Sequence, residues 1–510
     1  MSRLRRYKDA LISGYGVLGA NILYTLASVP LALAYLSKSE FGMWALTMQI
    51  AGYVALVDLG MSGAVARILI DHKDSRENGA YGSVVVTANL VGLVQGLLVL
   101  FAGCGLSLVA GPLLRVPPSL QREFVGLMMG LSAVQAVGFG TRVFSLILNA
   151  HQRNDVLNWS QTAIVALNYG TLWLGFSLGW GVYSLLLAQA IVQIATLASN
   201  IWWCVHLKFM PARGQWGRPT WELFTEIFSF GKDVFLYSVG YQLLSASQTV
   251  FITRALGLDL AATWSVCSRM YFLVSQVILR VFDYSYPALS EMVVRGETEK
   301  VARRFKSIAV LSFSLGMVGA ALLAICNQPF VTIWSHGRFR WSLGCDLMLS
   351  ALLPIIVLAR THIGFIGVTK DFRFLRYLYL CEGVFFAGLS LPTMSRLGIG
   401  AMIAASIIGS LTFSLPYGLL RTTQYFRLRH WTTVLGWYHP GLRVGVFLLP
   451  IAVGIWWITR SVSAPFSLCF RTLTIGIAAG LVFWKKGFDD SLKAELKDRL
   501  QTRWPLIGNW

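Results

Sequence analysis

The sequence predicts an all-α polytopic membrane protein with about fourteen transmembrane helices. Hydrophobic residues make up 55% of its 510 residues and charged residues only 13%, and the mean hydropathy is +0.62. A soluble protein carries about twice that charged fraction. The apolar residues also form runs of about 20, the length that an α-helix needs to cross the hydrocarbon core of a bilayer.

Short charged or glycine-containing breaks divide the chain into its candidate spans. In chain order these spans are Leu11–Leu36, Phe41–Ile70, Tyr81–Ala110, Phe124–Asn149, Val156–Leu178, Val182–Leu207, Val234–Thr253, Leu260–Phe282, Ser307–Ile333, Gly344–Val368, Leu375–Ser395, Gly398–Leu420, Val444–Thr459 and Leu468–Trp484. The thirteenth is short for a membrane crossing.

Basic residues indicate how these spans are oriented. If the N-terminus lies inside, the inside segments hold 29 of the 43 lysines and arginines, the outside segments hold 8, and 6 fall within spans. Basic residues concentrate in cytoplasmic loops, so we expect both termini to be cytoplasmic. The net charge of +20 is then a signal of topology and requires no nucleic-acid partner.

Two landmarks predict an internal repeat, because each recurs after six spans at an offset of 220 or 218 residues. They are Leu36 and Trp44, which recur as Leu256 and Trp264, and Arg142, which recurs as Arg360. Six is an even number, so both halves begin on the same side of the membrane as parallel repeats, an arrangement found in transporters. The sequence thus predicts two pseudo-symmetric six-helix bundles plus two C-terminal helices.

The predicted organisation has five parts. They are an N-terminal six-helix bundle (1–208), a cytoplasmic linker (209–233), a C-terminal six-helix bundle (234–420), the appended helices 13 and 14 (421–486) and a cytoplasmic amphipathic tail (487–510). In the tail, leucines at every fourth position share one helix face with Trp504, and basic residues lie around the other side. Such a helix is expected to lie on the inner leaflet; the alternative is a solvated tail.

Glycine motifs in the spans predict close helix packing. Gly14, Gly16 and Gly19 have the spacing of a dinucleotide-binding fingerprint, but that motif requires a preceding strand, whereas these glycines open a long apolar helix. Small residues in membrane helices let neighbouring helices approach closely. We interpret these glycines, and four pairs with a four-residue spacing, as packing positions. The pairs are Gly92/Gly96, Gly126/Gly130, Gly175/Gly179 and Gly476/Gly480.

Polar residues within spans 7 and 8 are the main candidates for substrate binding, because such residues are costly in a membrane and often functional. Each span carries them at helical spacing on one face. The stripe in span 8 is Ser265, Arg269, Phe272, Gln276, Arg280 and Asp283, and the stripe in span 7 is Ser238, Gln242, Ser245 and Thr249. Two consecutive polar stripes predict a wet cavity between the two halves.

Arg269 is the leading candidate among these residues. It lies about ten residues from either end of its span, which makes snorkelling to an interface difficult. It either lines the cavity or forms an internal salt bridge. Arg280 either lines the cavity or snorkels to the inner surface beside Asp283. The cavity candidates are Arg269, Gln242, Gln276, Ser245, Thr249 and Arg280.

Five further charges within spans are candidate functional residues. Arg67, Arg142 and Arg360 lie toward the inner ends of spans 2, 4 and 10, where they are either interfacial anchors or an inner mouth that attracts an anionic headgroup. Asp58 in span 2 and Glu382 in span 11 are the main buried acids. Each could relay a proton, bind Na⁺ or pair with an arginine. The seven histidines mostly lie near loops, so we expect them to be solvated or interfacial.

Enzyme signatures are missing from the sequence. It has no GxxxxGK[ST] or HExxH motif, which would indicate a phosphate-binding loop or a zinc peptidase. The longest outside loops, 111–123 and 334–343, are too short for a catalytic domain, and the seven cysteines show no metal-binding spacing. The sequence therefore predicts no enzyme, no metal and no cofactor, with coupling to H⁺ or Na⁺ left open.

Three segments resemble a known family. They are LSKSEFGMWAL (36–46) followed by LVDLGM (56–61), NAHQRND (149–155), and PALS (287–290) followed by GETE (296–299). These segments resemble the Wzx-like polysaccharide biosynthesis flippases of the multidrug/oligosaccharidyl-lipid/polysaccharide (MOP) exporter superfamily. The resemblance covers about the first 400 residues.

The resemblance implies two six-helix bundles around a central cavity lined by spans 1, 2, 7 and 8, and alternating access. It implies that a polyprenyl-pyrophosphate-linked oligosaccharide, an exopolysaccharide or O-antigen repeat unit of lipopolysaccharide, moves from the inner to the outer leaflet of the bacterial inner membrane. Its partners would be the lipid bilayer, glycosyltransferases and a polysaccharide polymerase. An arginine fork matches the oxygens of a pyrophosphate, so Arg269, supported by Gln242 and Gln276, is predicted to contact the pyrophosphate or the first sugar.

Two related classes stay open as alternatives. A lipid II flippase would also have fourteen spans and a cationic cavity. A MATE-like multidrug exporter would more often have twelve spans and an acid-rich cavity. A membrane glycosyltransferase or polymerase would need a larger outer loop than the sequence provides.

Overall fold

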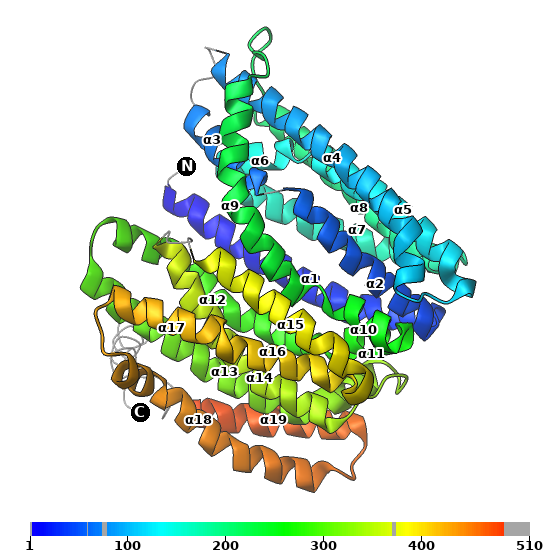
Figure 1. Cartoon of the computed structure of the whole chain (residues 1–510), viewed down its shortest axis with the longest axis vertical. Coiled ribbons are helices and arrows are strands. Elements are labelled where there is room, and N and C mark those ends of the chain that lie inside the picture. Colours follow the sequence, from blue (N-terminus) through cyan, green and yellow to red (C-terminus); the bar gives the residue numbers. More distant parts are fainter. Residues whose placement is uncertain (1–2, 59, 74–78, 370–373, 484–510) are drawn as a thin grey trace. The chain divides into compact units, whose positions relative to one another are not determined.

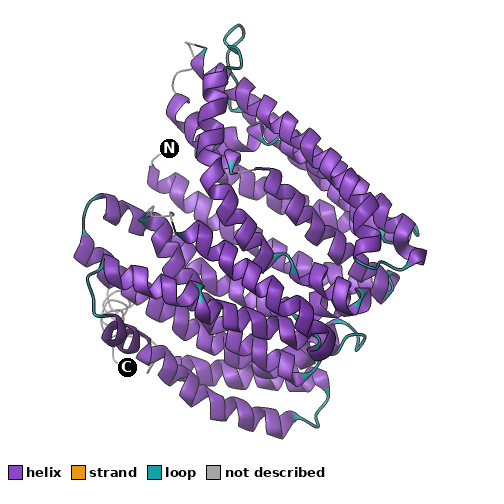
Figure 2. Ribbon diagram, viewed as in Figure 1, coloured by secondary structure: helices purple, strands orange, loops and turns teal. Residues whose placement is uncertain are grey.

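The computed structural model describes residues 3–58, 60–73, 79–369 and 374–483. Within these ranges the chain forms α-helices and short 3-10 helices joined by loops, without a β-strand (Figure 2). The predicted all-α class is therefore confirmed. The predicted amphipathic tail, 487–510, lies outside the described residues.

The helices fall into two units, Met1–Ala262 and Thr263–Trp510 (Figure 1). The first unit holds α1 (Arg3–Tyr35), α2 (Lys38–Val54), the 3-10 helix η1 (Ala55–Asp58), α3 (Met61–His72), α4 (Ala80–Leu113), η2 (Pro118–Leu120), α5 (Gln121–Gly140), α6 (Val143–Ala150), α7 (Asn154–Ser177), α8 (Tyr183–His206), α9 (Trp221–Ser245) and α10 (Gln248–Leu256). The short helix α11 (Leu258–Cys267) contains the boundary. The second unit continues with α12 (Arg269–Val294), α13 (Thr298–Trp334), α14 (Leu343–Val368), α15 (Leu375–Leu397), α16 (Ile399–Thr412), α17 (Ser414–Tyr425), α18 (His430–Thr459) and α19 (Ala464–Val482). The five-part organisation of the chain stays a prediction.

Eleven helices among the described residues are long and apolar enough to cross a membrane, or twelve if α11 and α12 count as one bent span. The chain is thus a multi-pass membrane protein, but the predicted count of fourteen spans is not confirmed. Neither α7 nor α9 is among the eleven. Polar residues interrupt α7, and one of them, Asn158, donates a hydrogen bond to Ser13 of α1 (3.1 Å).

Several predicted spans are broken helices. The second becomes α2, η1 and α3, the fourth becomes α5 and α6, the seventh becomes α9 and α10, and the eighth becomes α11 and α12 with a bend of 42°. At the first break Gly60 has a φ of 73°, a conformation that glycine adopts without steric cost but that a right-handed helix cannot contain. Span 8 is therefore not one continuous helix as predicted, because hydropathy reports the apolar length of a span and not its continuity.

The thirteenth span is longer than predicted. Helix α18 runs from His430 to Thr459, and its apolar part covers Gly436–Thr459. The predicted start at Val444 lies just after Pro440, which is inside the helix. Proline usually marks a helix end, but a membrane helix tolerates it where neighbouring groups satisfy the freed backbone.

Glycines bring α4 and α5 into close contact, and the two helices lie side by side (Figure 1). A Cβ atom at Gly92 would lie 2.6 Å from the carbonyl oxygen of Phe139, and one at Gly96 would lie 2.5 Å from that of Ala136. Both distances are shorter than real Cβ contacts, so a larger residue would force the backbones apart. The packing role predicted for this pair is confirmed.

The other predicted packing glycines differ from one another. Gly126 and Gly130 of α5 lie against the side chains of Tyr183 and Leu186 from α8, which confirms their role. Gly14, Gly16 and Gly175 also have close neighbours. At the remaining predicted positions a Cβ would meet nothing within 4 Å in the described part of the chain, so the packing prediction was wrong there; these are Gly19, Gly179, Gly476 and Gly480.

We expect Gly96→Val to destabilise the protein by about 2–3 kcal/mol, because overpacking against a backbone carbonyl cannot be relieved by a rotamer change. Gly105→Val is the matched control, since it lies on the same helix where a Cβ meets nothing within 4 Å. Thermal unfolding of the two variants in the same detergent measures the difference. Equal midpoints would contradict the close α4–α5 contact.

Arg471 fastens α19 to α13 and α18. The residue is 5% exposed. Its Nη1 donates to the carbonyl oxygen of Ile325 (2.6 Å), and its Nε and Nη2 donate to the hydroxyl (2.7 Å) and carbonyl (3.3 Å) oxygens of Thr459. The Ile325 carbonyl needs a donor because Pro329, four residues further along α13, has no N–H. Arg471 supplies that donor.

His362 joins three helices of the second unit. It is 1% exposed, its Nδ1 lies 2.9 Å from the hydroxyl of Thr422, and its Nε2 is hydrogen-bonded with the hydroxyl of Tyr438. These contacts connect α14, α17 and α18. The expectation of a solvated or interfacial histidine was wrong here, because its place near the end of a span did not reveal the helices that cover it.

Candidate functional site

Asp58 and Arg142 meet at two helix breaks of the first unit. Asp58 ends η1 and Arg142 immediately precedes α6. The Nη1 of Arg142 forms an ion pair with Asp58 and donates to the hydroxyl oxygen of Ser62, which itself donates to Asp58 (2.7 Å). The guanidinium also lies 4.0 Å from the centre of the Phe139 ring. The structure thus brings a predicted inner-mouth residue and a predicted coupling acid together.

Gln95 of α4 supports the same break. Its Nε2 donates to the carbonyl oxygens of Val57 (3.2 Å) and Asp58 (3.0 Å), groups that need partners because η1 ends there. Gln95 is 6% exposed. Gln95 is not among the predicted site residues, although an amide in the middle of an apolar run is a signal in the sequence that points to it.

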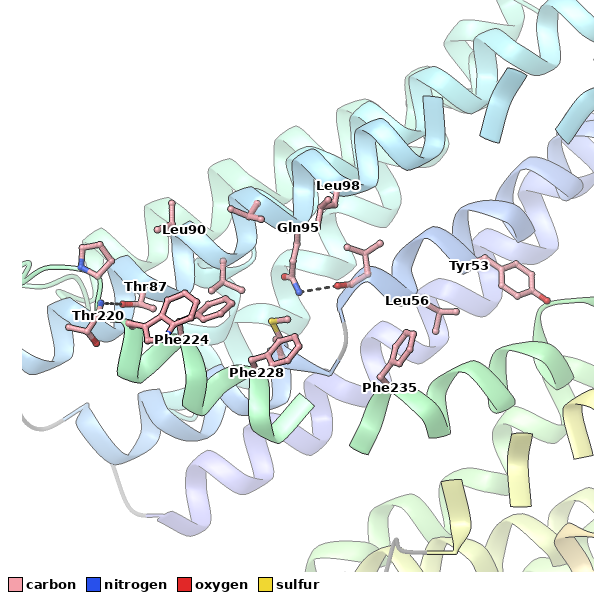
Figure 3. Close-up of a pocket in the computed structure, with 16 residues that line it drawn as sticks. Tyr53, Leu56, Thr87, Leu90, Gln95, Leu98, Thr220, Phe224, Phe228 and Phe235 are labelled. Atoms are coloured by element: carbon pink, nitrogen blue, oxygen red, sulfur yellow. Dashed lines mark hydrogen bonds between the residues drawn. The ribbon is translucent and has the colours of Figure 1, made fainter. Parts of the chain in front are cut away.

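A long cavity runs beside this cluster, between α2 with η1, the start of α3, α4 and α9 (Figure 3). Its volume is about 940 Å³, and none of the sixteen described residues that line it is charged. Thr220, Phe224 and Phe228 lie toward one end, and Tyr53 and Phe235 lie toward the other. Its aromatic wall comes from α9, which begins thirteen residues before the predicted seventh span. The sequence analysis therefore missed this cavity.

The polar side chains in the cavity wall already have hydrogen-bond partners in the protein. Thr87 accepts from the backbone N–H of Thr220 (3.4 Å), and the Thr220 hydroxyl accepts from the backbone N–H of Leu223 (3.4 Å). Gln95 is used at the η1 break, and the Tyr53 hydroxyl bonds the hydroxyl of Ser247. The cavity therefore offers an apolar surface.

Arg269 is the first residue of α12, directly after the break that follows α11. It is half-buried. The break itself is held by Asn327 of α13, whose Nδ2 donates to the carbonyl oxygen of Cys267 (2.9 Å) and to the carboxylate of Asp346 (2.6 Å). Asp346 is 2% exposed and also accepts from Trp341 Nε1 (2.8 Å). Asp346 was missed because an acid in the first turn of a span suggests an interfacial residue.

The other predicted residues of span 8 lie further along α12. Gln276 is exposed and Arg280 is half-buried. The Nη1 of Arg280 lies 4.0 Å from the carboxylate of Asp283, and both side chains are about 40% exposed. This geometry accords with the alternative in which Arg280 extends toward a surface beside Asp283. The helical spacing of Arg269, Gln276 and Arg280 still places them on the face of α12 that carries Phe272.

The predicted residues of span 7 belong to the first unit. Gln242 packs against Gly52 of α2. The Ser245 hydroxyl donates to the backbone of its own helix at Tyr241 (2.8 Å). Thr249 is 5% exposed, and its backbone N–H donates to Gln49 of α2 (2.7 Å). A cavity shared by these residues and those of α12 stays a prediction.

Arg67 and Arg360 lie in different units. Arg67 is exposed on α3, and Arg360 is half-buried on α14. Unlike Arg142, neither lies at a helix break. Their role at an inner mouth stays a prediction.

Glu382 of α15 is a buried carboxyl group with hydroxyl neighbours. It is 2% exposed, and its Oε1 accepts from Ser410 of α16 (3.3 Å) and Ser414 of α17 (3.2 Å). Its Oε2 is buried and has no hydrogen-bond partner among the described residues. A carboxyl with one satisfied and one available oxygen can take up a proton or a cation.

The fold is similar to that of MOP superfamily transporters. A multidrug resistance MATE family transporter in an inward-facing conformation matches with a TM-score of 0.68 over 79% of this chain and 95% of its own, at 13% identity. A MOP superfamily transporter from Pyrococcus furiosus gives 0.61 over 82% and 96%, at 13% identity. The lipid II flippase MurJ in an inward closed conformation gives 0.64 over 93% and 99%, at 12% identity. Likeness at these identities shows the fold alone.

Sequence comparison identifies the family. A search of curated proteins finds no significant match. A family profile described as polysaccharide biosynthesis protein matches residues 7–293, more than half of the chain. This range contains four of the segments that carry the resemblance (36–46, 56–61, 149–155 and 287–290), and the structural neighbours are transporters and a flippase. The chain therefore belongs to the polysaccharide biosynthesis protein family, with the fold of the MOP superfamily.

Proposed function

We propose that the protein is a flippase that moves a polyprenyl-pyrophosphate-linked oligosaccharide from the inner to the outer leaflet of the bacterial inner membrane by alternating access. A sugar headgroup cannot cross hydrocarbon unaided, because its polar groups would lose their water without compensation. Polar residues inside apolar spans replace that water, while the lipid tail stays in the bilayer. Both termini are proposed to be cytoplasmic.

One observation carries this proposal: Arg269 opens α12 at a break within an apolar span. The N-terminus of a helix is a favourable place for an anion, because its N–H groups and macrodipole are positive. Broken helices whose N-terminal ends face anionic substrate groups are a feature of transporters. A guanidinium at such an end would place a bidentate donor beside a pyrophosphate, and Gln276 would assist further along the same helix.

Transport is proposed to be coupled to H⁺ or Na⁺ through Glu382, because it combines deep burial with an oxygen that has no partner among the described residues. Asp58 is a weaker candidate for coupling, because it is already paired with Arg142. No other cofactor is proposed.

Glu382→Gln is expected to remove the dependence of transport on an imposed ion gradient, because glutamine keeps the shape and loses the ionisable group. Glu299→Gln is the matched control, since Glu299 is exposed in the first turn of α13. The rate at which lipid-linked oligosaccharide moves between the two leaflets of proteoliposomes, with and without a H⁺ or Na⁺ gradient, measures the effect. Unchanged gradient dependence in Glu382→Gln would exclude Glu382 as the coupling group.

A lipid II flippase is the second candidate. The match to MurJ covers 93% of this chain, against 79% for the first multidrug transporter. The charged residues at helix breaks would suit lipid II as well, because it also carries a pyrophosphate. The two candidates differ in the headgroup attached to the pyrophosphate.

Deletion of the gene tests the proposal and separates the two candidates. If the protein moves a polysaccharide repeat unit, that unit accumulates as a lipid-linked oligosaccharide on the inner leaflet and lipid II turnover is unchanged. Accumulation of lipid II would favour the second candidate. Normal levels of both, with altered drug sensitivity, would overturn the flippase proposal. Under the first outcome, the glycosyltransferases and polymerase acting on the same repeat unit are the proposed partners.

A further inference from the structure

The apolar cavity of the first unit is a site that the proposed function does not yet use. It follows α9 from Trp221 to Phe235, which corresponds to about 21 Å of helix. It follows α4 from Thr87 to Leu98, or about 17 Å. Its shape is therefore a slot along two helices, long enough for an extended hydrocarbon chain.

The described lining of this slot favours an apolar occupant. None of its described lining residues is charged, and the polar side chains in its wall are hydrogen-bonded to the protein. A polar ligand would lose its water there and find few partners among the described lining residues. A hydrocarbon chain keeps an apolar environment when it moves into the slot from the surrounding bilayer, so it gives up no hydrogen bonds.

The Pro219–Trp221 end of the slot has the features of a membrane interface. Trp216 is 41% exposed and Trp221 is 77% exposed, and tryptophan concentrates at the boundary between lipid and water. Arg213 and Arg218 lie exposed in the loop before this end. The predicted topology places the loop on the cytoplasmic side, where the charges are available to a headgroup.

This basic loop is held against α4. The backbone N–H of Arg218 donates to the hydroxyl of Ser83 (3.2 Å). A side chain at Gly82 would collide with the backbone of Gln215 and Trp216, so the loop lies directly on the first turn of α4. The backbone of the loop at Arg218 therefore has a defined place near the end of the slot.

We propose that this slot binds the polyprenyl chain of the lipid-linked substrate in the inner leaflet, with the pyrophosphate near Arg213 and Arg218. This inference rests on the proposed function and adds an entry site for the substrate. The slot would accept an extended hydrocarbon chain, and the positive charges of the two arginines would attract the pyrophosphate.

The end of the slot favours a prenyl chain over a phospholipid. In a phospholipid, ester groups lie between the phosphate and the acyl chains and require polar partners. The hydroxyl oxygens of Thr87 and Thr220 at this end already accept backbone N–H groups, so these two groups can donate at most one hydrogen bond each to the four oxygens of two esters. In a polyprenyl pyrophosphate the hydrocarbon begins directly at the phosphate oxygen. A headgroup at Arg218 and a chain in an apolar slot therefore match it without an unsatisfied ester.

Photo-crosslinking of the purified full-length protein in nanodiscs tests this inference. One probe is a polyprenyl pyrophosphate with a diazirine in its chain, and the other is phosphatidylglycerol with the same group in an acyl chain. We expect the prenyl probe to label peptides of α4 and α9. Equal or stronger labelling of these peptides by phosphatidylglycerol, or no labelling by either probe, would overturn the inference.

A matched pair of variants locates the label. Leu98 lines the slot and Leu97 does not, although the two are similarly exposed, at 53% and 55%. Leu98→Trp should reduce prenyl labelling at least fivefold, and Leu97→Trp should leave it unchanged, at equal unfolding midpoints. If Leu98→Trp fails to fold, Arg213→Ala and Arg218→Ala keep the test open. Each should weaken prenyl binding about fivefold, and wild-type binding in both would contradict the inference.

The crosslinking experiment can fail while the proposed flippase function holds, and the reverse is also possible. A deletion strain that accumulates the lipid-linked oligosaccharide, together with an unlabelled slot, would leave the flippase standing and remove the entry site. A deletion strain with normal lipid-linked saccharides would remove the flippase itself.

Discussion

Arg269→Ala is expected to lower the rate of oligosaccharide flipping about 10- to 150-fold, because a hydrogen bond to a charged group contributes about 1.5–3 kcal/mol. The arginine stands at the N-terminus of α12, where the charge of the side chain and the helix dipole act on the same anion. Arg269→Lys should be intermediate, since lysine keeps the charge and loses the planar donor fork. Accumulation of the lipid-linked oligosaccharide on the inner leaflet of a complemented deletion strain measures the effect.

Arg295→Ala is the matched control for this experiment. Arg295 follows the other end of α12, where it forms an exposed ion pair with Glu291. The substitution Arg295→Ala removes one positive charge at the end of the same helix. It should leave the rate of flipping within a factor of two of wild type, since exposed ion pairs contribute little to stability. A wild-type rate in Arg269→Ala, at normal expression, would remove Arg269 from the substrate site.

Arg471→Leu is expected to lower the free energy of unfolding by about 3–5 kcal/mol, because it leaves buried carbonyl groups without their charged donor. The carbonyl oxygens concerned are those of Ile325 and Thr459. Arg471→Lys should recover only part of this loss, since an ammonium group cannot reproduce the planar contacts to α13 and α18. Denaturation in detergent, followed by tryptophan fluorescence, measures the change.

A double-mutant cycle with Pro329 tests the physical cause. Pro329→Ala restores a backbone N–H that can bond the carbonyl oxygen of Ile325 within α13, so that carbonyl no longer depends on Arg471. Arg471→Leu should therefore cost about 1–2 kcal/mol less in the Pro329→Ala background. An equal cost in both backgrounds would show that Arg471 stabilises the protein in some other way.

Three of the charges within the spans lie at breaks in helices. The sequence analysis singled out Asp58, Arg142 and Arg269 because ionisable groups are costly in a membrane. In the structure Asp58 ends η1, Arg142 precedes α6 and Arg269 begins α12. A helix break leaves backbone groups without partners, and charged or amide side chains can satisfy them. The functional role predicted for these three residues stays a prediction.

The sequence by itself determined the class of this protein. The length and apolar character of the runs predicted a helical membrane protein, and segments such as 36–46 and 149–155 predicted its family. The Gly92/Gly96 spacing predicted a close contact that is present in the structure. These properties can be read from the chain because bilayer thickness and helix geometry act on consecutive residues.

Only the tertiary structure decided which distant residues meet. Nothing in the sequence pairs Arg142 with Asp58, Arg471 with Ile325, or His362 with two other helices. The slot between α4 and α9 depends on a helical start at Trp221, in a segment whose polarity suggested a linker. Apolar periodicity reports that a helix face is covered but not by which helix, because hydrocarbon and protein interiors are similarly apolar.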